Sequence, residues 1–65
     1  MNKNGSPIAP EILVVDDESS ARQALVALLT EDGYDVRDAP DGFKAVGTIR
    51  TFKPDLVMLD WMMPK

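Results

Sequence analysis

The chain has 65 residues, of which 7 are basic and 11 are acidic, so it carries a formal net charge of −4 and has room for one small domain at most. It contains no cysteine and no histidine, which excludes disulfides, thiolate-held zinc and histidine-based acid–base catalysis. The acidic balance disfavours nucleic acid or an anionic membrane as a direct partner, and any metal ion must be a hard cation held by oxygen atoms.

The first ten residues, MNKNGSPIAP, show no periodicity, which indicates a flexible lead-in over residues 1–10 and a domain that begins at residue 11. This lead-in lacks the apolar centre of a signal peptide. The longest apolar runs, at residues 12–15 and 56–59, are far shorter than the roughly 20 residues that a membrane-spanning helix needs. We therefore expect a cytoplasmic protein that does not associate with membranes.

The first predicted elements are a strand and a helix. Residues 11–15 (EILVV) form a continuous apolar run that is followed by three acids, which predicts a strand buried on both faces. Apolar residues then recur at helical spacing, which predicts a helix with Ser19 as its N-cap and Gly33 at its end in a left-handed conformation. These apolar residues are Ala21, Ala24, Leu25, Leu28 and Leu29.

The remaining sequence repeats the alternation. Residues 34–39 predict a second strand, the turn at residues 40–42 leads into a second helix, and residues 56–59 (LVML) predict a third strand. Gly47, inside the second helix, costs about 1 kcal/mol relative to alanine. Strands that alternate with helices pair in parallel through right-handed crossovers, so the order predicts an α/β fold. The second helix places Gly42, Ala45, Val46 and Ile49 on one face.

Acidic residues follow two of the three predicted strands. Asp16, Asp17 and Glu18 come after the first strand, and Asp60 comes after the third. Ligands of open parallel sheets bind at the carboxyl ends of the strands, so Asp16, Asp17 and Asp60 converge if these two strands are neighbours. Such carboxylates repel one another unless a cation neutralises them, and Mg²⁺ or a similar hard ion suits oxygen ligands. Helix capping or a solvated loop is the alternative for the first three acids, whereas Pro64 argues against it for Asp60.

Three motifs at these positions resemble the receiver domain of bacterial two-component response regulators. They are ILVVDDE after the lead-in, APDGFKA before the second helix and PDLVMLDWMMP around the third strand. Their combination at these separations is specific, whereas each motif alone would be weak. The resemblance implies an incomplete flavodoxin-like (CheY-like) β-α-β-α-β fold with parallel strand order 2-1-3, and it makes residues 11–65 the amino-terminal half of a receiver domain.

The resemblance also implies a function, which is transfer of a phosphoryl group from a sensor histidine kinase or phosphotransfer protein to one aspartate. Asp60 is the expected phosphoacceptor and becomes 4-aspartylphosphate. The implied Mg²⁺ ligands are Asp17 directly, Asp16 mostly through water, Asp60, and the backbone carbonyl of Met62. We expect no enzyme activity beyond phosphorylation and dephosphorylation of this aspartate.

The chain departs from the family's pattern because it ends at Lys65, after the third strand. The Ser/Thr of the family's fourth strand and the lysine of its fifth, which contact the phosphoryl oxygens, are missing, and Lys65 does not match either position. We therefore expect impaired phosphorylation, an exposed apolar edge on the third strand, and an isolated chain that is not a stable two-state monomer.

Two other functions are alternatives to phosphotransfer. The first is a half-receiver that carries no phosphate and acts as an interaction module, by self-association or by pairing with a partner at the exposed third strand. The second is an aspartate-nucleophile hydrolase of the haloacid-dehalogenase type. The hydrolase is disfavoured because that class needs a second acid two residues after the nucleophile, where this chain has Met62.

Overall fold

The computed structural model describes residues 9–59, which form three strands and two helices in alternation. Most of the predicted lead-in, residues 1–8, lies outside the described residues, as do residues 60–65. No helix in the described part of the chain has the length and apolar character that a membrane span requires. In chain order the elements are β1 (Glu11–Val15), α1 (Ser19–Glu31), β2 (Asp35–Ala39), α2 (Gly42–Phe52) and β3 (Leu56–Leu59).

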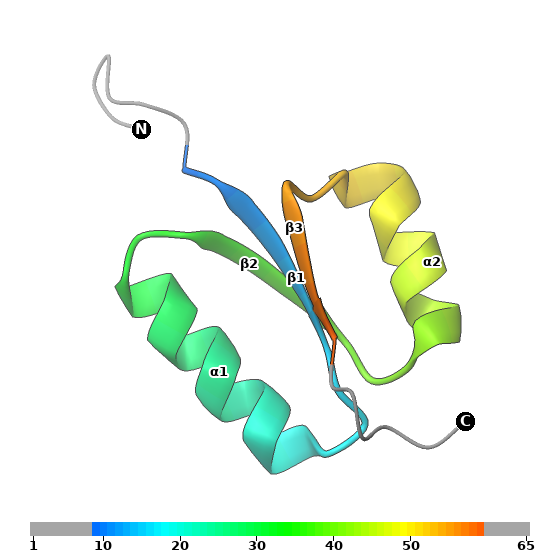
Figure 1. Ribbon diagram of the computed structural model, residues 1–65, viewed down its shortest axis with the longest axis horizontal. Coiled ribbons are helices and arrows are strands. Elements are labelled where there is room, and N and C mark those ends of the chain that lie inside the picture. Colours follow the sequence, from blue (N-terminus) through cyan, green and yellow to red (C-terminus); the bar gives the residue numbers. More distant parts are fainter. Residues whose placement is uncertain (1–8, 60–65) are drawn as a thin grey trace.

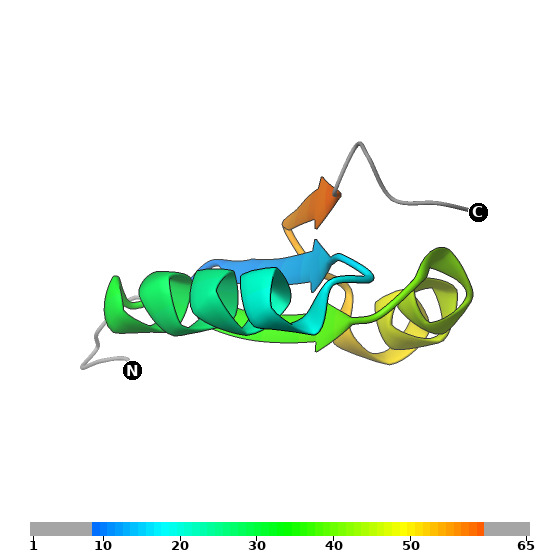
Figure 2. The ribbon, with the colours of Figure 1, turned by 90° about the horizontal axis from the view of Figure 1, so that it is seen from below.

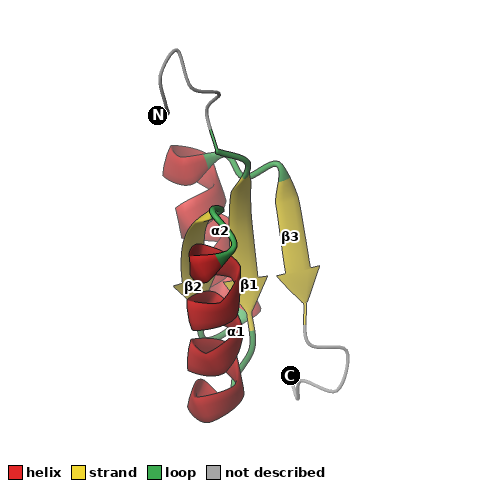
Figure 3. Ribbon diagram, turned by 90° about the vertical axis from the view of Figure 1, so that its left-hand side faces the viewer, coloured by secondary structure: helices red, strands yellow, loops and turns green. Residues whose placement is uncertain are grey.

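The strands form one parallel sheet in the order β2-β1-β3, with all three arrows pointing the same way in Figure 3. Figure 1 shows the sheet between the two helices, with α1 on one face and α2 on the other. This placement follows from right-handed crossovers, because the chain moves from β1 outward to β2 and then back across β1 to β3. The predicted α/β arrangement and its strand order 2-1-3 are confirmed.

The centre of the molecule is β1, whose last four residues are at most 4% exposed. Leu13 and Val15 pack in one cluster with Ala39 of β2 and Ala45 of α2. Side chains alternate along a strand, so Ile12 and Val14 lie on the other face, toward α1. The prediction of a first strand buried on both faces is therefore confirmed.

Away from β1 the apolar surface is only partly covered. β3 is an edge strand of the described sheet, and Leu56 and Leu59 are 52% and 55% exposed. In α1, which is described throughout, no residue is fully buried, and Leu28 is 58% exposed. On the predicted apolar face of α2, Ala45 is buried whereas Val46 remains exposed. Among residues 9–59 the apolar faces of the helices are therefore only half covered.

The start of α1 differs from the prediction by one residue. The N-cap is Glu18 rather than Ser19, because the Glu18 Oε1 atom accepts a hydrogen bond of 2.8 Å from the backbone N–H of Ala21. Ser19 is already helical. An acid at this position also interacts favourably with the positive end of the helix dipole.

The end of α1 confirms the predicted role of Gly33, whose φ of 99° is left-handed. The N–H of Gly33 donates to the carbonyl of Thr30, and the N–H of Tyr34 donates to the carbonyl of Leu29. These two bonds make a Schellman motif. Tyr34 therefore belongs to the helix end, which explains why β2 begins at Asp35 and not at residue 34 as predicted.

The amino end of β3 is fastened to β1 by a reciprocal pair of hydrogen bonds. The N–H of Asp55 donates to the carbonyl of Glu11 at 2.7 Å, and the N–H of Glu11 donates to Oδ2 of Asp55 at 2.8 Å. The strands then run in register from Ile12 opposite Leu56 to Val15 opposite Leu59. This pair of hydrogen bonds, which we call the Glu11–Asp55 latch, fixes the register of the two strands. It therefore decides which residues lie opposite each other at the carboxyl ends of β1 and β3.

Candidate functional site

The carboxyl ends of all three strands lie at one edge of the sheet, where the loops to α1 and α2 also leave, as Figure 2 shows. In this register Val15 is opposite Ala39 on one side and Leu59 on the other. Asp16 follows Val15, and Asp60 follows Leu59 in the sequence. This edge is where the sequence places the candidate site, and where open parallel sheets bind ligands.

The three acids of the loop between β1 and α1 have different surroundings. Oδ1 of Asp16 accepts a hydrogen bond of 2.9 Å from the backbone N–H of Glu18, which closes a tight turn. The Glu18 carboxylate caps α1, so capping accounts for one of the three acids. Asp17 is exposed, and no residue between 9 and 59 donates a hydrogen bond to its carboxylate. One oxygen of Asp16 and both oxygens of Asp17 therefore have no protein donor in the described chain.

Arg22 ties this loop to the neighbouring strand. Its Nη1 atom donates to the backbone carbonyl of Asp16, and its Nε atom donates to Oδ2 of Asp38, both at 2.8 Å. The Arg22 side chain is 13% exposed and that of Asp38 is 37% exposed. Sequence reasoning missed both residues. The position of Arg22, one turn after the acidic loop, was a usable signal, but its pairing with Asp38, 16 residues later, depends on how α1 crosses β2.

A small hollow of about 150 Å³ adjoins Asp16 between α1 and the carboxyl ends of β1 and β3. Among residues 9–59, Asp16 is the one charged residue in its lining. A hollow here leaves room for a group to approach the acidic loop along the sheet edge. The other lining residues are Val14, Val15, Leu25, Met58 and Leu59.

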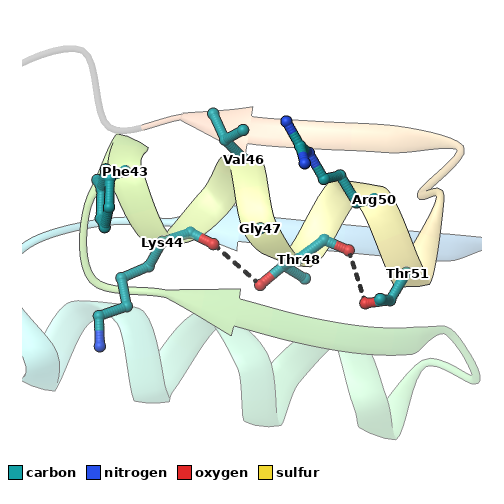
Figure 4. A pocket seen from close by; sticks show the side chains of 7 residues that line it. All are labelled: Phe43, Lys44, Val46, Gly47, Thr48, Arg50 and Thr51. Atoms are coloured by element: carbon teal, nitrogen blue, oxygen red, sulfur yellow. Dashed lines mark hydrogen bonds between the residues drawn. The ribbon is translucent and has the colours of Figure 1, made fainter.

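A larger surface groove, of about 660 Å³, runs along the outer side of α2, and neither Asp16 nor Asp17 lines it. Figure 4 shows that its hydroxyl groups are engaged within the helix, because Thr48 donates to the carbonyl of Lys44 and Thr51 to that of Thr48. Gly47 opens the groove by having no side chain. The charged side chains that line this groove are those of Lys44 and Arg50, which are cationic, so among the described residues the groove lacks the carboxylates of the acidic loop. Phe43, Val46 and Arg50 complete its lining.

The predicted ligand set is described in part. Asp16 and Asp17 lie together at the sheet edge, whereas Asp60 and Met62 lie outside the described residues, so their convergence stays a prediction. Within residues 9–59 no group of three acidic side chains is arranged to hold a metal ion. The Asp16–Asp17 pair nevertheless fits the chemistry of Mg²⁺, because Asp17 is exposed, Asp16 is half-buried, and both offer carboxylate oxygens without a protein donor in the described chain.

A parallel α/β sheet with an acidic pair after its central strand defines a class of fold and site, and comparison with known proteins narrows it. The response regulator receiver domain family matches residues 12–65, and the chain belongs to that family.

Its relatives include transcription regulators. The alkaline phosphatase synthesis transcriptional regulatory protein PhoP of Bacillus subtilis is 51% identical over 55 residues, which cover 85% of this chain and 23% of PhoP. The DNA-binding response regulator MtrA of Mycobacterium tuberculosis is 43% identical over 53 residues, or 82% of this chain and 23% of MtrA. The probable transcriptional regulator ycf27 of Porphyridium aerugineum is 49% identical over 55 residues, with shares of 85% and 23%. The chain thus spans less than a quarter of the length of these relatives.

Proposed function

We propose that this chain is a phosphoacceptor module of a cytoplasmic, bacterial-type two-component relay. In this proposal Asp60 takes a phosphoryl group from the phosphohistidine of a sensor histidine kinase or phosphotransfer protein. Family membership supports the receiver role, and the acidic loop after β1 supports the phosphoryl chemistry.

The observation that carries the proposal is the register of β1 and β3. Val15 and Leu59 are paired, and the next residue in each segment is an acid, Asp16 or Asp60. Neighbouring strands lie about 4.8 Å apart, so acids that continue two paired strands start from adjacent positions. At about 5 Å two carboxylates repel by about 1 to 3 kcal/mol, depending on the local dielectric, which a bound cation would offset.

The reaction itself is a displacement at phosphorus. A carboxylate oxygen of Asp60 attacks the phosphoryl group, the bond from phosphorus to the histidine nitrogen breaks, and an acyl phosphate forms on the aspartate. Asp16, Asp17, Asp60 and the carbonyl of Met62 would hold Mg²⁺. The ion, when bound, supplies positive charge beside the phosphoryl oxygens. The part of Asp16 and Asp17 is to bind that ion, and the part of Asp60 is to attack the phosphoryl group.

The test is intact-mass spectrometry after incubation with acetyl phosphate and Mg²⁺, followed by peptide mapping. We expect the added mass of one phosphoryl group on Asp60, its loss in Asp60→Asn, and its retention in the control Asp35→Asn, which changes an exposed acid at the opposite end of the sheet. Wild-type chain that stays unmodified under conditions that modify a longer receiver would contradict the proposal. Modification that persists in Asp60→Asn would contradict the assignment of the nucleophile.

The exposure of β3 favours a second candidate function, an interaction module that carries no phosphate. Leu56, Val57 and Leu59 are exposed along an edge strand of the described sheet, and its sequence, LVML, contains no charge or proline to discourage pairing. Such a module would leave Asp60 unmodified and would sediment with a mass that rises with concentration. Phosphorylation of a chain that sediments as a monomer would exclude it.

A further inference from the structure

We propose that Arg22 is a positioning residue that holds the acidic loop in the shape that a divalent cation needs, and that Asp38 cancels the charge that Arg22 brings with it. The inference rests on the Mg²⁺ site of the proposed function and extends it to two residues that do not contact the ion.

The Arg22 side chain connects separate parts of the sheet edge. From the first turn of α1 it contacts the backbone of Asp16 and the carboxylate of Asp38 at the end of β2, both at 2.8 Å. It therefore joins three elements at the sheet edge. The Arg22 side chain is only 13% exposed, and a charge without a partner in such surroundings would be costly.

Hydrogen bonds hold the backbone of the acidic loop at Asp16. The N–H of Asp16 donates to the carbonyl of Ala39 at 3.2 Å, and its carbonyl accepts from Arg22, so both sides of this residue are held. Its carboxylate is held as well, through the N–H of Glu18. The direction in which the chain presents Asp17 then follows from a fixed starting point. Mg²⁺ requires near-ideal octahedral geometry, so a loop free to rotate would bind it more weakly.

The Asp38 carboxylate offsets the positive charge of Arg22. A positive charge next to a cation site repels the cation, so a clamp made of arginine alone would work against the site that it shapes. The ion pair with Asp38 removes most of that repulsion while leaving the hydrogen bond to Asp16 in place. The pair thus supplies a strong donor to the loop with almost no net charge.

These two roles predict opposite signs for the same substitution. If Arg22 acted through charge alone, Arg22→Met would remove a positive charge and tighten Mg²⁺ binding. If Arg22 acts by positioning, Arg22→Met weakens binding. We expect the Mg²⁺ dissociation constant to rise about tenfold, the lower end of the effect of losing a group that orients metal ligands. Asp38→Asn keeps an acceptor for Arg22 but leaves the positive charge of Arg22 without a counter-charge. This substitution should therefore raise the Mg²⁺ dissociation constant, by a smaller factor than Arg22→Met does.

The experiment is a titration of the chain with MgCl₂. Binding is measured by calorimetry and by the fluorescence of Trp61, the one tryptophan of the sequence. Far-UV circular dichroism of each variant reports whether the fold is kept. Arg50→Met, an exposed arginine on α2 outside the acidic loop, is the matched control and should leave the constant unchanged. Arg22→Lys, which keeps the charge and a donor but cannot make both contacts in the same geometry, should fall between wild type and Arg22→Met.

The results of the titration distinguish a failure of the positioning role of Arg22 from a failure of the Mg²⁺ site itself. Wild-type chain that binds Mg²⁺, with an unchanged or lower constant in Arg22→Met, would overturn the positioning role alone. If Arg22→Met loses its helical signal, Arg22→Lys decides in its place, and a wild-type constant in that variant overturns the inference. Wild-type chain that fails to bind Mg²⁺ would remove the metal site of the proposed function, and this inference with it.

Discussion

Two glycines of the chain should respond oppositely to replacement by alanine, because their backbone conformations differ. Gly47 lies in the middle of α2, and Gly33 follows α1 with a φ of 99°. A Cβ atom added at either position meets no atom within 4 Å, so neither replacement by alanine causes a steric clash. Backbone conformation therefore decides the sign in each case.

The magnitudes follow from the two conformations. Gly47→Ala should stabilise the fold by about 1 kcal/mol, which is the difference in helix propensity. Gly33→Ala should destabilise it by about 1 kcal/mol, because a left-handed L-residue costs about 1 to 2 kcal/mol and the loss of freedom in the unfolded chain returns part of this. A domain of this size is stable by only a few kcal/mol, so each change is a sizeable fraction of the total.

The assay is urea unfolding followed by far-UV circular dichroism. We expect the midpoint to rise in Gly47→Ala and to fall in Gly33→Ala, and the helical signal without urea to change in the same directions if folding is incomplete. Thermal midpoints should move by about 4 to 8 °C per kcal/mol. Shifts of the same sign in both variants would refute the reasoning, because they would show that the φ of Gly33 does not govern its replacement.

Three further predictions concern packing, capping and the sheet edge. Leu13→Ala, at a fully buried position, should cost about 2 to 5 kcal/mol, which is comparable to the whole stability of so small a domain, and should remove most of the helical signal in far-UV circular dichroism without urea. Leu28→Ala, at a position 58% exposed, should cost under about 1 kcal/mol and keep that signal, and an equal loss in both variants would contradict the described core. Asp41→Ala removes the acceptor for the N–H of Lys44 at the start of α2 and should lower the free energy of unfolding by about 1 kcal/mol, with Asp41→Asn close to wild type. Val57→Lys should lower the mass that sediments at high concentration if copies pair through β3, and an unchanged mass would count against such pairing.

The elements with strong local patterns were predicted correctly. Residues 11–15 and 56–59 are continuous apolar runs between polar or turn residues, and both are strands. The left-handed end of α1 followed from the presence of Gly33, because few other residues adopt that conformation at low cost. The parallel order 2-1-3 followed from the alternation of strands with helices together with the resemblance to receivers.

The errors arose where two local solutions were close in energy. Both Glu18 and Ser19 can cap a helix, and the turn closed by the Asp16 carboxylate, which the sequence does not specify, favours Glu18. The contact between Arg22 and Asp38 was not predicted because it depends on the angle at which α1 crosses β2. Tertiary geometry of this kind leaves no periodic signal in the sequence.

The Glu11–Asp55 latch, at the amino end of β3, also fixes the alignment of residues at the carboxyl end of the sheet. If β3 slipped by one residue, Leu59 would no longer lie opposite Val15, its side chains would turn to the other face, and the acid that follows would move by about 3.3 Å. Asp55 thus fixes, from the amino end of β3, the alignment of Leu59 with Val15 at its carboxyl end. Under the proposed function, Asp55→Ala should therefore reduce the phosphorylation of Asp60, measured by intact mass after incubation with acetyl phosphate and Mg²⁺, because it removes the hydrogen bond that aligns β3 with β1.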